Sequence, residues 1–70
     1  MMRLSARNQV RARVTAITEG DATANVELDA NGVRMVAAIT VEAARELGLG
    51  EGSEVIAMIK ASDVILAVPE

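Results

Sequence analysis

Basic residues gather at the start of a chain whose net charge is −3. Four of the seven basic residues stand within the first thirteen positions, namely Arg3, Arg7, Arg11 and Arg13. Arg7 belongs to the stretch LSARNQ, where Ser5 adds a hydroxyl group and Asn8 an amide. Guanidinium and hydroxyl donors that stand close together are suited to binding an anion. The opening stretch is therefore a first candidate for an anion site.

A second candidate lies near the C-terminus, in the stretch IKASD. Lys60 is the only lysine of the chain, and Ser62 follows it between two apolar runs. A polar hairpin turn is the simpler interpretation of this spacing. The alternative is an anion cradle, in which Lys60 supplies charge, Ser62 a hydroxyl group and the turn its backbone N–H groups.

Composition disfavours several classes of function. The chain has no His, Cys or Tyr, and no close partner would make Ser5 or Ser62 a nucleophile, so we do not expect an enzyme. The acidic balance and the lack of aromatic residues speak against a nucleic-acid partner. No apolar run approaches the roughly 18 residues of a membrane span, and the N-terminus lacks a signal-peptide core. These features, with the absence of cysteine, favour a cytoplasmic location.

The elements that must position the two candidate stretches are mostly strands. VRARVTAITEG, ATANVELD and VRMVAAIT each alternate apolar and polar residues, which predicts three strands with one solvated face. Turn residues separate them at Glu19–Asp21 and Ala30–Gly32, and Asn-Gly in the second turn favours a tight hairpin. The three strands should therefore form a meander.

A short helix should follow the third strand. Apolar residues recur at helical spacing at Val41, Ala44 and Leu47. Thr40 is suited to cap the helix N-terminus, Gly48 fits the position just past its end, and Leu49 should fold back on the helix.

Two later runs, Val55–Ile59 and Val64–Val68, are apolar without alternation, which predicts strands that are buried on both faces. Pro69 ends the second run, because proline cannot donate to a strand ladder. Together the elements predict one mostly β domain over residues 1–70, a small five-stranded OB-like barrel with one short helix.

Self-association is expected from the size of the chain. A 70-residue domain buries only about 60% of its unfolded surface, and this one has neither disulfides nor residues for a structural zinc site. Strands that are apolar on both faces need a neighbour on the second face. The residues therefore predict a homo-oligomer.

Three stretches in order resemble the molbindin family, the Mop-type domain that also occurs as the TOBE domain of molybdate transport and regulatory proteins. They are LSARNQ at positions 4–9, TEGDATANVEL at 18–28, and AAITVEAARELGLGEGSEVIAMIKASDVILAV at 37–68. The resemblance covers nearly the whole chain. It implies binding of molybdate or tungstate at subunit interfaces, for intracellular storage or homeostasis, in a hexamer built as a trimer of dimers.

Carried over residue by residue, the resemblance implies an oxyanion site with the metal held as its oxyanion. Its residues would be Ser5, Arg7, Lys60, Ala61 and Ser62, with Ala61 acting through its backbone N–H. A possible second oxyanion site would involve Gly20, Ala22 and Thr23, although Asp21 brings a negative charge close to it. The three other early arginines would shape the local field or pair with acidic residues of neighbouring subunits.

A weaker resemblance supports an alternative. The stretch VRMVAAITVEAARELGLGEGSEVIAMI is similar to the swapped hairpin of AbrB-like DNA-binding transcription regulators, in which the early arginines would face DNA. The acidic balance opposes this interpretation, and it leaves the KASDV turn unexplained. Within the leading interpretation, the sequence does not separate molybdate from tungstate, because both are tetrahedral dianions of nearly equal size.

Overall fold

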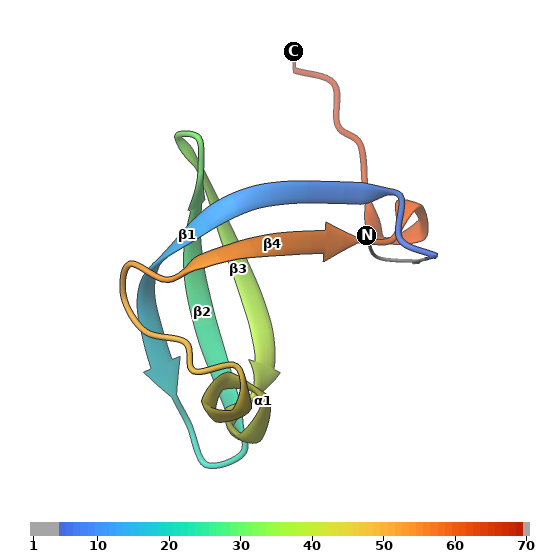
Figure 1. Ribbon diagram of the computed structural model, residues 1–70. Coiled ribbons are helices and arrows are strands. Elements are labelled where there is room, and N and C mark those ends of the chain that lie inside the picture. Colours follow the sequence, from blue (N-terminus) through green and yellow to red (C-terminus); the bar gives the residue numbers. More distant parts are fainter. Residues whose placement is uncertain (1–4, 70) are drawn as a thin grey trace.

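Alternating apolar residues build one antiparallel sheet, which the computed structural model describes over residues 5–69 (Figure 1). The elements are β1 (Asn8–Glu19), β2 (Thr23–Ala30), β3 (Val33–Thr40), α1 (Val41–Glu46), β4 (Glu54–Ile59) and the 3-10 turn η1 (Ala61–Asp63). The strand order is β3-β2-β1-β4, and each neighbouring pair is antiparallel. The mostly β architecture with one short helix is thus confirmed. Within residues 5–69, no helix has the length and apolar character needed to cross a membrane.

The core is built from small residues on one face of the sheet. Val14 of β1 and Val26 of β2 are 1% and 2% exposed, the lowest values among the large side chains. The buried residues around them are Ala12, Leu28 and Ala30, and a second group beside the helix contains Ala24, Val41 and Ala44. Because no aromatic side chain is present, the core is shallow, and part of its lining remains open to solvent.

β1 changes its partner in the middle. Its first half, Asn8 to Arg13, pairs with β4, and its second half pairs with β2. The register shifts between Val14 and Ala16, so Thr15 is an extra residue, and its hydroxyl donates to the Glu27 carbonyl at 3.2 Å. A bulge of this kind bends a strand and reverses the facing of later residues. Ile17, and not Ala16 as the alternation predicts, therefore packs against the core.

One consequence of the bend is a two-stranded arm, which we define as residues 8–12 of β1 with residues 55–59 of β4. β2 begins to pair with β1 only at Arg13, so among residues 5–69 the arm has no third strand beside it. Figure 1 shows the arm extending from the body of the sheet toward η1.

The helix has the predicted ends. The Thr40 hydroxyl accepts from the Ala43 N–H at 3.0 Å. At the other end Gly48 adopts φ 64°, its N–H donates to the Arg45 carbonyl, and the Leu49 N–H donates to the Ala44 carbonyl. This pair of bonds is a Schellman motif, which glycine favours because it lacks a Cβ.

Replacing Thr40 with alanine should lower the free energy of unfolding by about 1 kcal/mol, because the Ala43 N–H loses its side-chain acceptor. For a domain of this size the melting temperature should fall by about 4–8 °C. Thermal melts followed by far-UV circular dichroism at one protein concentration measure the change. Thr40→Ser keeps the acceptor and serves as the control. Equal melting temperatures for the alanine variant and the parent would show that the cap does not stabilise the fold.

The predicted fifth strand is not confirmed. Residues 64–69 form neither helix nor strand, and Ile65, Leu66 and Val68 are 92%, 88% and 88% exposed. The reason is that no described strand lies beside this segment, so residues 5–69 form four strands and no closed barrel. The expectation of burial on both faces also fails for β4 in the single chain, where Ile56 and Met58 remain exposed.

Candidate functional site

The two polar stretches meet at one end of the arm. Asn8 stands opposite Ile59 in the β1–β4 ladder, and its side-chain amide donates to the Ile59 carbonyl at 3.1 Å. Arg7 immediately precedes this pair and Lys60 immediately follows it. Figure 1 shows the beginning of β1 and η1 side by side at this end. Strand pairing thus brings together two stretches that are about fifty residues apart in the sequence.

The turn after β4 presents unused donors. Lys60 has an extended backbone (φ −64°, ψ 142°), and the 3-10 turn begins at Ala61. The Lys60 carbonyl accepts from the Asp63 N–H at 2.9 Å, while no described residue accepts from the N–H groups of Ala61 or Ser62. The turn therefore offers two backbone donors next to the Lys60 ammonium and the Ser62 hydroxyl group.

The charge at this end of the arm is positive. Arg7 and Lys60 are exposed, and neither forms an ion pair with a described carboxylate. Asp63 is the one acidic residue of the turn. Ser5, Ala61 and Ser62 are exposed as well, so in the single chain the cluster lies open to water. An anion bound there would be enclosed only if a further chain covered it.

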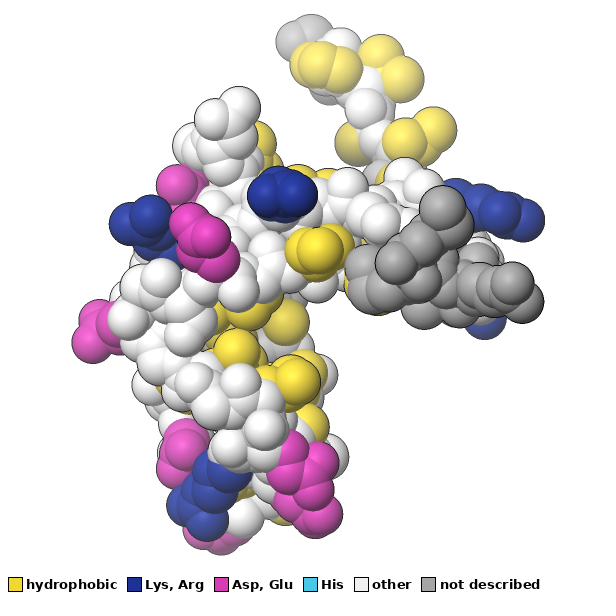
Figure 2. All heavy atoms as spheres, viewed as in Figure 1, with side chains coloured by type: hydrophobic (Ala, Val, Ile, Leu, Met, Phe, Trp, Pro, Cys, Tyr) yellow, Lys and Arg dark blue, Asp and Glu magenta, His cyan; other side chains and the backbone are white. Residues whose placement is uncertain are grey.

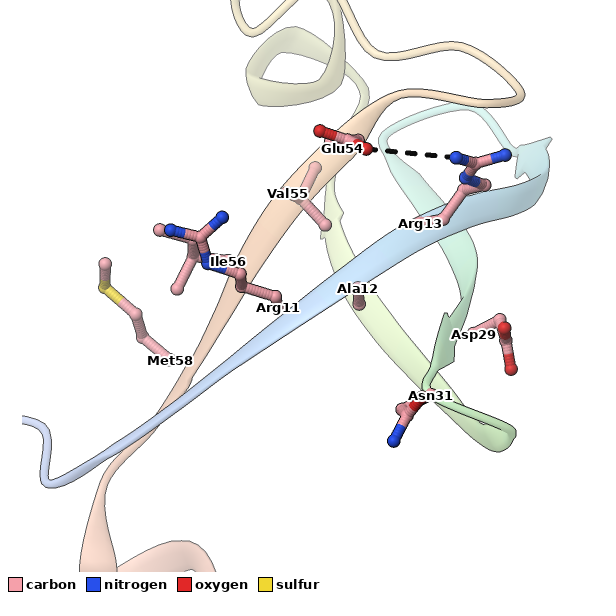
Figure 3. A pocket seen from close by; sticks show the side chains of 9 residues that line it. All are labelled: Arg11, Ala12, Arg13, Asp29, Asn31, Glu54, Val55, Ile56 and Met58. Atoms are coloured by element: carbon pink, nitrogen blue, oxygen red, sulfur yellow. Dashed lines mark ion pairs between the residues drawn. The ribbon is translucent and has the colours of Figure 1, made fainter.

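The other early arginines have different surroundings. Arg13 lies 3.8 Å from Glu54 of its own chain, so an acidic partner is already present without a neighbouring subunit (Figure 3). Arg11 stands opposite Ile56 on the outer face of the arm. Arg3 lies outside the described residues.

A hollow on this outer face was not anticipated from the sequence. Its lining consists of Arg11, Ala12, Arg13, Asp29, Asn31, Glu54, Val55, Ile56 and Met58 (Figure 3). The two guanidinium groups are balanced by two carboxylates, which would repel an anionic ligand. The hollow is therefore a poorer anion site than the cluster at the end of the arm. Only the strand register, which places Arg11 against Ile56, could have revealed it.

The loop proposed for a second oxyanion site lies at the opposite end of β1. The Gly20 N–H donates to the Thr23 carbonyl at 2.8 Å, and the Ala22 carbonyl accepts from the Val41 N–H at 2.9 Å. A Cβ on Gly20 would lie 3.2 Å from the Thr23 carbonyl, which explains the glycine. The structure does not bring these residues near Arg7 or Lys60, so any second site would be separate.

Comparisons with known proteins match this architecture. The TOBE domain family matches residues 4–66. Molybdenum-pterin-binding protein 3 from Clostridium pasteurianum is 39% identical over 66 residues, which cover 93% of this chain and 97% of that protein.

Solved structures agree in fold. A molybdate-binding protein from Sporomusa ovata has a TM-score of 0.92 at 34% identity, covering 96% of this chain and 100% of its own. The cytoplasmic molybdate-binding protein ModG, in a form with molybdate bound, has a TM-score of 0.91 at 45% identity and covers 97% of this chain and 49% of its own. The resemblance inferred from the motifs is confirmed, and the chain belongs to the TOBE domain family, among the Mop-type molbindins.

Proposed function

We propose that this protein binds molybdate, or the closely similar tungstate dianion, at the end of the arm. The observation that carries the proposal is the pairing of Asn8 with Ile59, which puts Arg7 and the turn that begins after Lys60 at the same end of the arm. The names of the similar proteins, which describe molybdenum-pterin or molybdate binding, support the same ligand.

The chemistry of the cluster fits a tetrahedral dianion. Such an anion needs several converging hydrogen-bond donors and about two neutralising charges, and charge-assisted bonds supply most of the affinity. Arg7 and Lys60 provide the two charges, and the hydroxyl groups of Ser5 and Ser62 and the N–H of Ala61 provide neutral donors. The metal is held as its oxyanion by hydrogen bonds, with no side-chain ligand to the metal itself.

The bound anion is released unchanged in this proposal, so the protein stores or buffers it in the cytoplasm. The site is completed between subunits of a homohexamer, arranged as a trimer of dimers, in which residues 64–68 form the fifth strand of a closed OB-like barrel. The openness of the cluster and the exposure of the apolar C-terminal segment support this assembly. Gly20, Ala22 and Thr23 are proposed as a second, separate oxyanion site. No particular observation favours the DNA-binding alternative.

Native mass spectrometry with molybdate, tungstate and excess sulfate, each added separately, tests the proposal. We expect a hexamer that gains discrete molybdate or tungstate masses and is unchanged by sulfate. Isothermal titration with the same anions measures the affinity. Absence of saturable binding at tens of micromolar anion would contradict the proposed ligand, and a dimer that ignores all three anions would contradict the assembly as well.

A further inference from the structure

One side-chain hydrogen bond joins the two strands at the tip of the arm. Asn8 begins β1 and Ile59 ends β4, and the Asn8 amide nitrogen donates to the Ile59 carbonyl at 3.1 Å. A carbonyl oxygen only accepts, so the amide faces it with an N–H group. Both residues are half-buried, whereas Arg7 and Lys60 beside them are exposed. The bond therefore lies one residue away from each of the two charges of the proposed anion site.

The bond acts on the turn through a peptide group. The Ile59 carbonyl belongs to the planar unit that continues into the nitrogen and Cα of Lys60, so holding this carbonyl restricts where Lys60 begins. Beyond it the turn is held by its own bonds. The Asp63 N–H donates to the Lys60 carbonyl at 2.9 Å, and the Val64 N–H donates to the Ala61 carbonyl at 3.3 Å. The direction of the whole turn is thus set at the peptide that follows Ile59.

Packing does not hold the turn in place. None of the residues Ala61–Asp63 is buried. The end of a two-stranded ribbon is also where strand pairing is weakest in water. In the part of the chain that the structure describes, the bond from Asn8 is the only side-chain hydrogen bond that ties the two strands together at this end. The turn therefore depends on it for a fixed position relative to β1.

The charges at the tip oppose this fixed position. Arg7 and Lys60 carry like charges, and neither forms an ion pair with a described carboxylate. On the face that Figure 2 shows, basic side chains lie at this end of the arm and acidic ones lie away from it. Like charges repel, which favours separation of the two strands in the absence of an anion. The neutral amide of Asn8 counteracts this repulsion and leaves both charges free for a ligand.

We infer that Asn8 is a positioning residue, whose amide fixes the Lys60–Ser62 turn relative to Arg7 so that the free protein already presents its donors together. The inference rests on the proposed function for the identity of the ligand. A site whose competent arrangement is only partly populated binds more weakly in proportion to that fraction. Loss of the one hydrogen bond is expected to weaken molybdate binding about two- to tenfold.

Replacing Asn8 with leucine tests the inference, because leucine is similar in size and lacks the donor without adding a charge. Isothermal titration with molybdate measures the dissociation constant of the full assembly. ¹⁵N relaxation of the same protein, free and with anion, measures picosecond–nanosecond order at the N–H groups of residues 60–62. Asn8→Ala separates the lost donor from the shape of leucine. Gln9→Leu is the matched control, because it removes an amide from the next, exposed position of β1, opposite Met58.

In both Asn8 variants we expect the order parameters of residues 60–62 in the free protein to fall from about 0.85 toward 0.6, and to recover when the anion is bound. The dissociation constant should rise about two- to tenfold. The order of the Val26 N–H, in the buried centre of β2, should not change, and the Gln9 control should match the parent protein in every respect.

Three results would overturn the inference. Weaker binding with unchanged order in the free protein would show that Asn8 acts by touching the anion. Lost order with the affinity of the parent would show that the position of the turn does not limit binding. No change in either quantity would show that the bond is dispensable. If the parent protein itself bound no molybdate, the proposed function would fail, and the order of the free protein alone would decide whether Asn8 fixes the turn.

Discussion

Replacing Ile65 with aspartate is expected to dissociate the assembly into single chains. Ile65 is 92% exposed in the single chain, and in the proposed assembly it lies on a strand covered on both faces. Burying an isoleucine side chain contributes about 1.5–3 kcal/mol, and that contribution is lost. A carboxylate without a partner in the same place adds a desolvation cost of several kcal/mol. Both effects recur in every copy.

Sedimentation velocity or native mass spectrometry measures the result. Val33→Asp is the matched control, because it makes the same chemical change at an exposed β-branched residue of the β2–β3 hairpin, outside residues 64–68. The control should keep the mass of the parent assembly. If the Ile65 variant also kept that mass, residues 64–68 would not form an interface.

Replacing either Arg7 or Lys60 with alanine is expected to weaken molybdate binding by roughly ten- to a hundredfold while leaving the assembly intact. Each substitution removes one charge-assisted contact worth about 1.5–3 kcal/mol, and each 1.4 kcal/mol is a factor of about ten in the dissociation constant. Both side chains are exposed, so the fold does not depend on them. Isothermal titration with molybdate measures the affinity, and native mass spectrometry checks the oligomer.

Arg11→Ala is the control for the two site variants. It removes a guanidinium group, as Arg7→Ala does, but from the outer face of the arm. The affinity of the Arg11→Ala variant for molybdate should equal that of the parent protein. Loss of affinity in the Arg11 variant together with full affinity in the Arg7 variant would move the site to the hollow of Figure 3.

Local features of the fold were predictable because their causes are local. The alternation of Ala24, Val26 and Leu28 places one face of β2 in the core. Asn31 and Gly32 adopt the positive φ values of 53° and 92° that a two-residue hairpin requires. Thr40 and Gly48 cap the helix through bonds that span only a few residues.

Features that depend on distant partners were not predictable in the same way. No residue type marks Thr15 as the bulge, because the register shift results from β1 pairing with two different strands. The apolar run at residues 64–68 predicted a strand that packs on the core of its own chain and on a neighbouring subunit, but in the single chain this segment is exposed and forms no strand.

For the candidate site, the residue types suggested anion chemistry at each stretch separately. Asn8 and Ile59 are brought together by the β1–β4 ladder, and nothing in either stretch alone specifies that register. The family resemblance supplied the connection, and the structure supplies its physical basis. Whether these side chains hold the anion is the question that the Arg7 and Lys60 variants address.

The bend at Thr15 has a consequence for local stability. Among the residues that the structure describes, residues 8–12 and 55–59 are paired only with each other, and a two-stranded ribbon is marginally stable in water. In the single chain, the arm should therefore open more readily than the body of the sheet, in which β2 lies between β1 and β3. The proposed site lies at the tip of this weakly held ribbon, so an anion bound there would act as a fastener between the two chain segments. In such an arrangement the free energy of ligand binding and the local unfolding equilibrium are linked, and filling the site stiffens the scaffold that forms it.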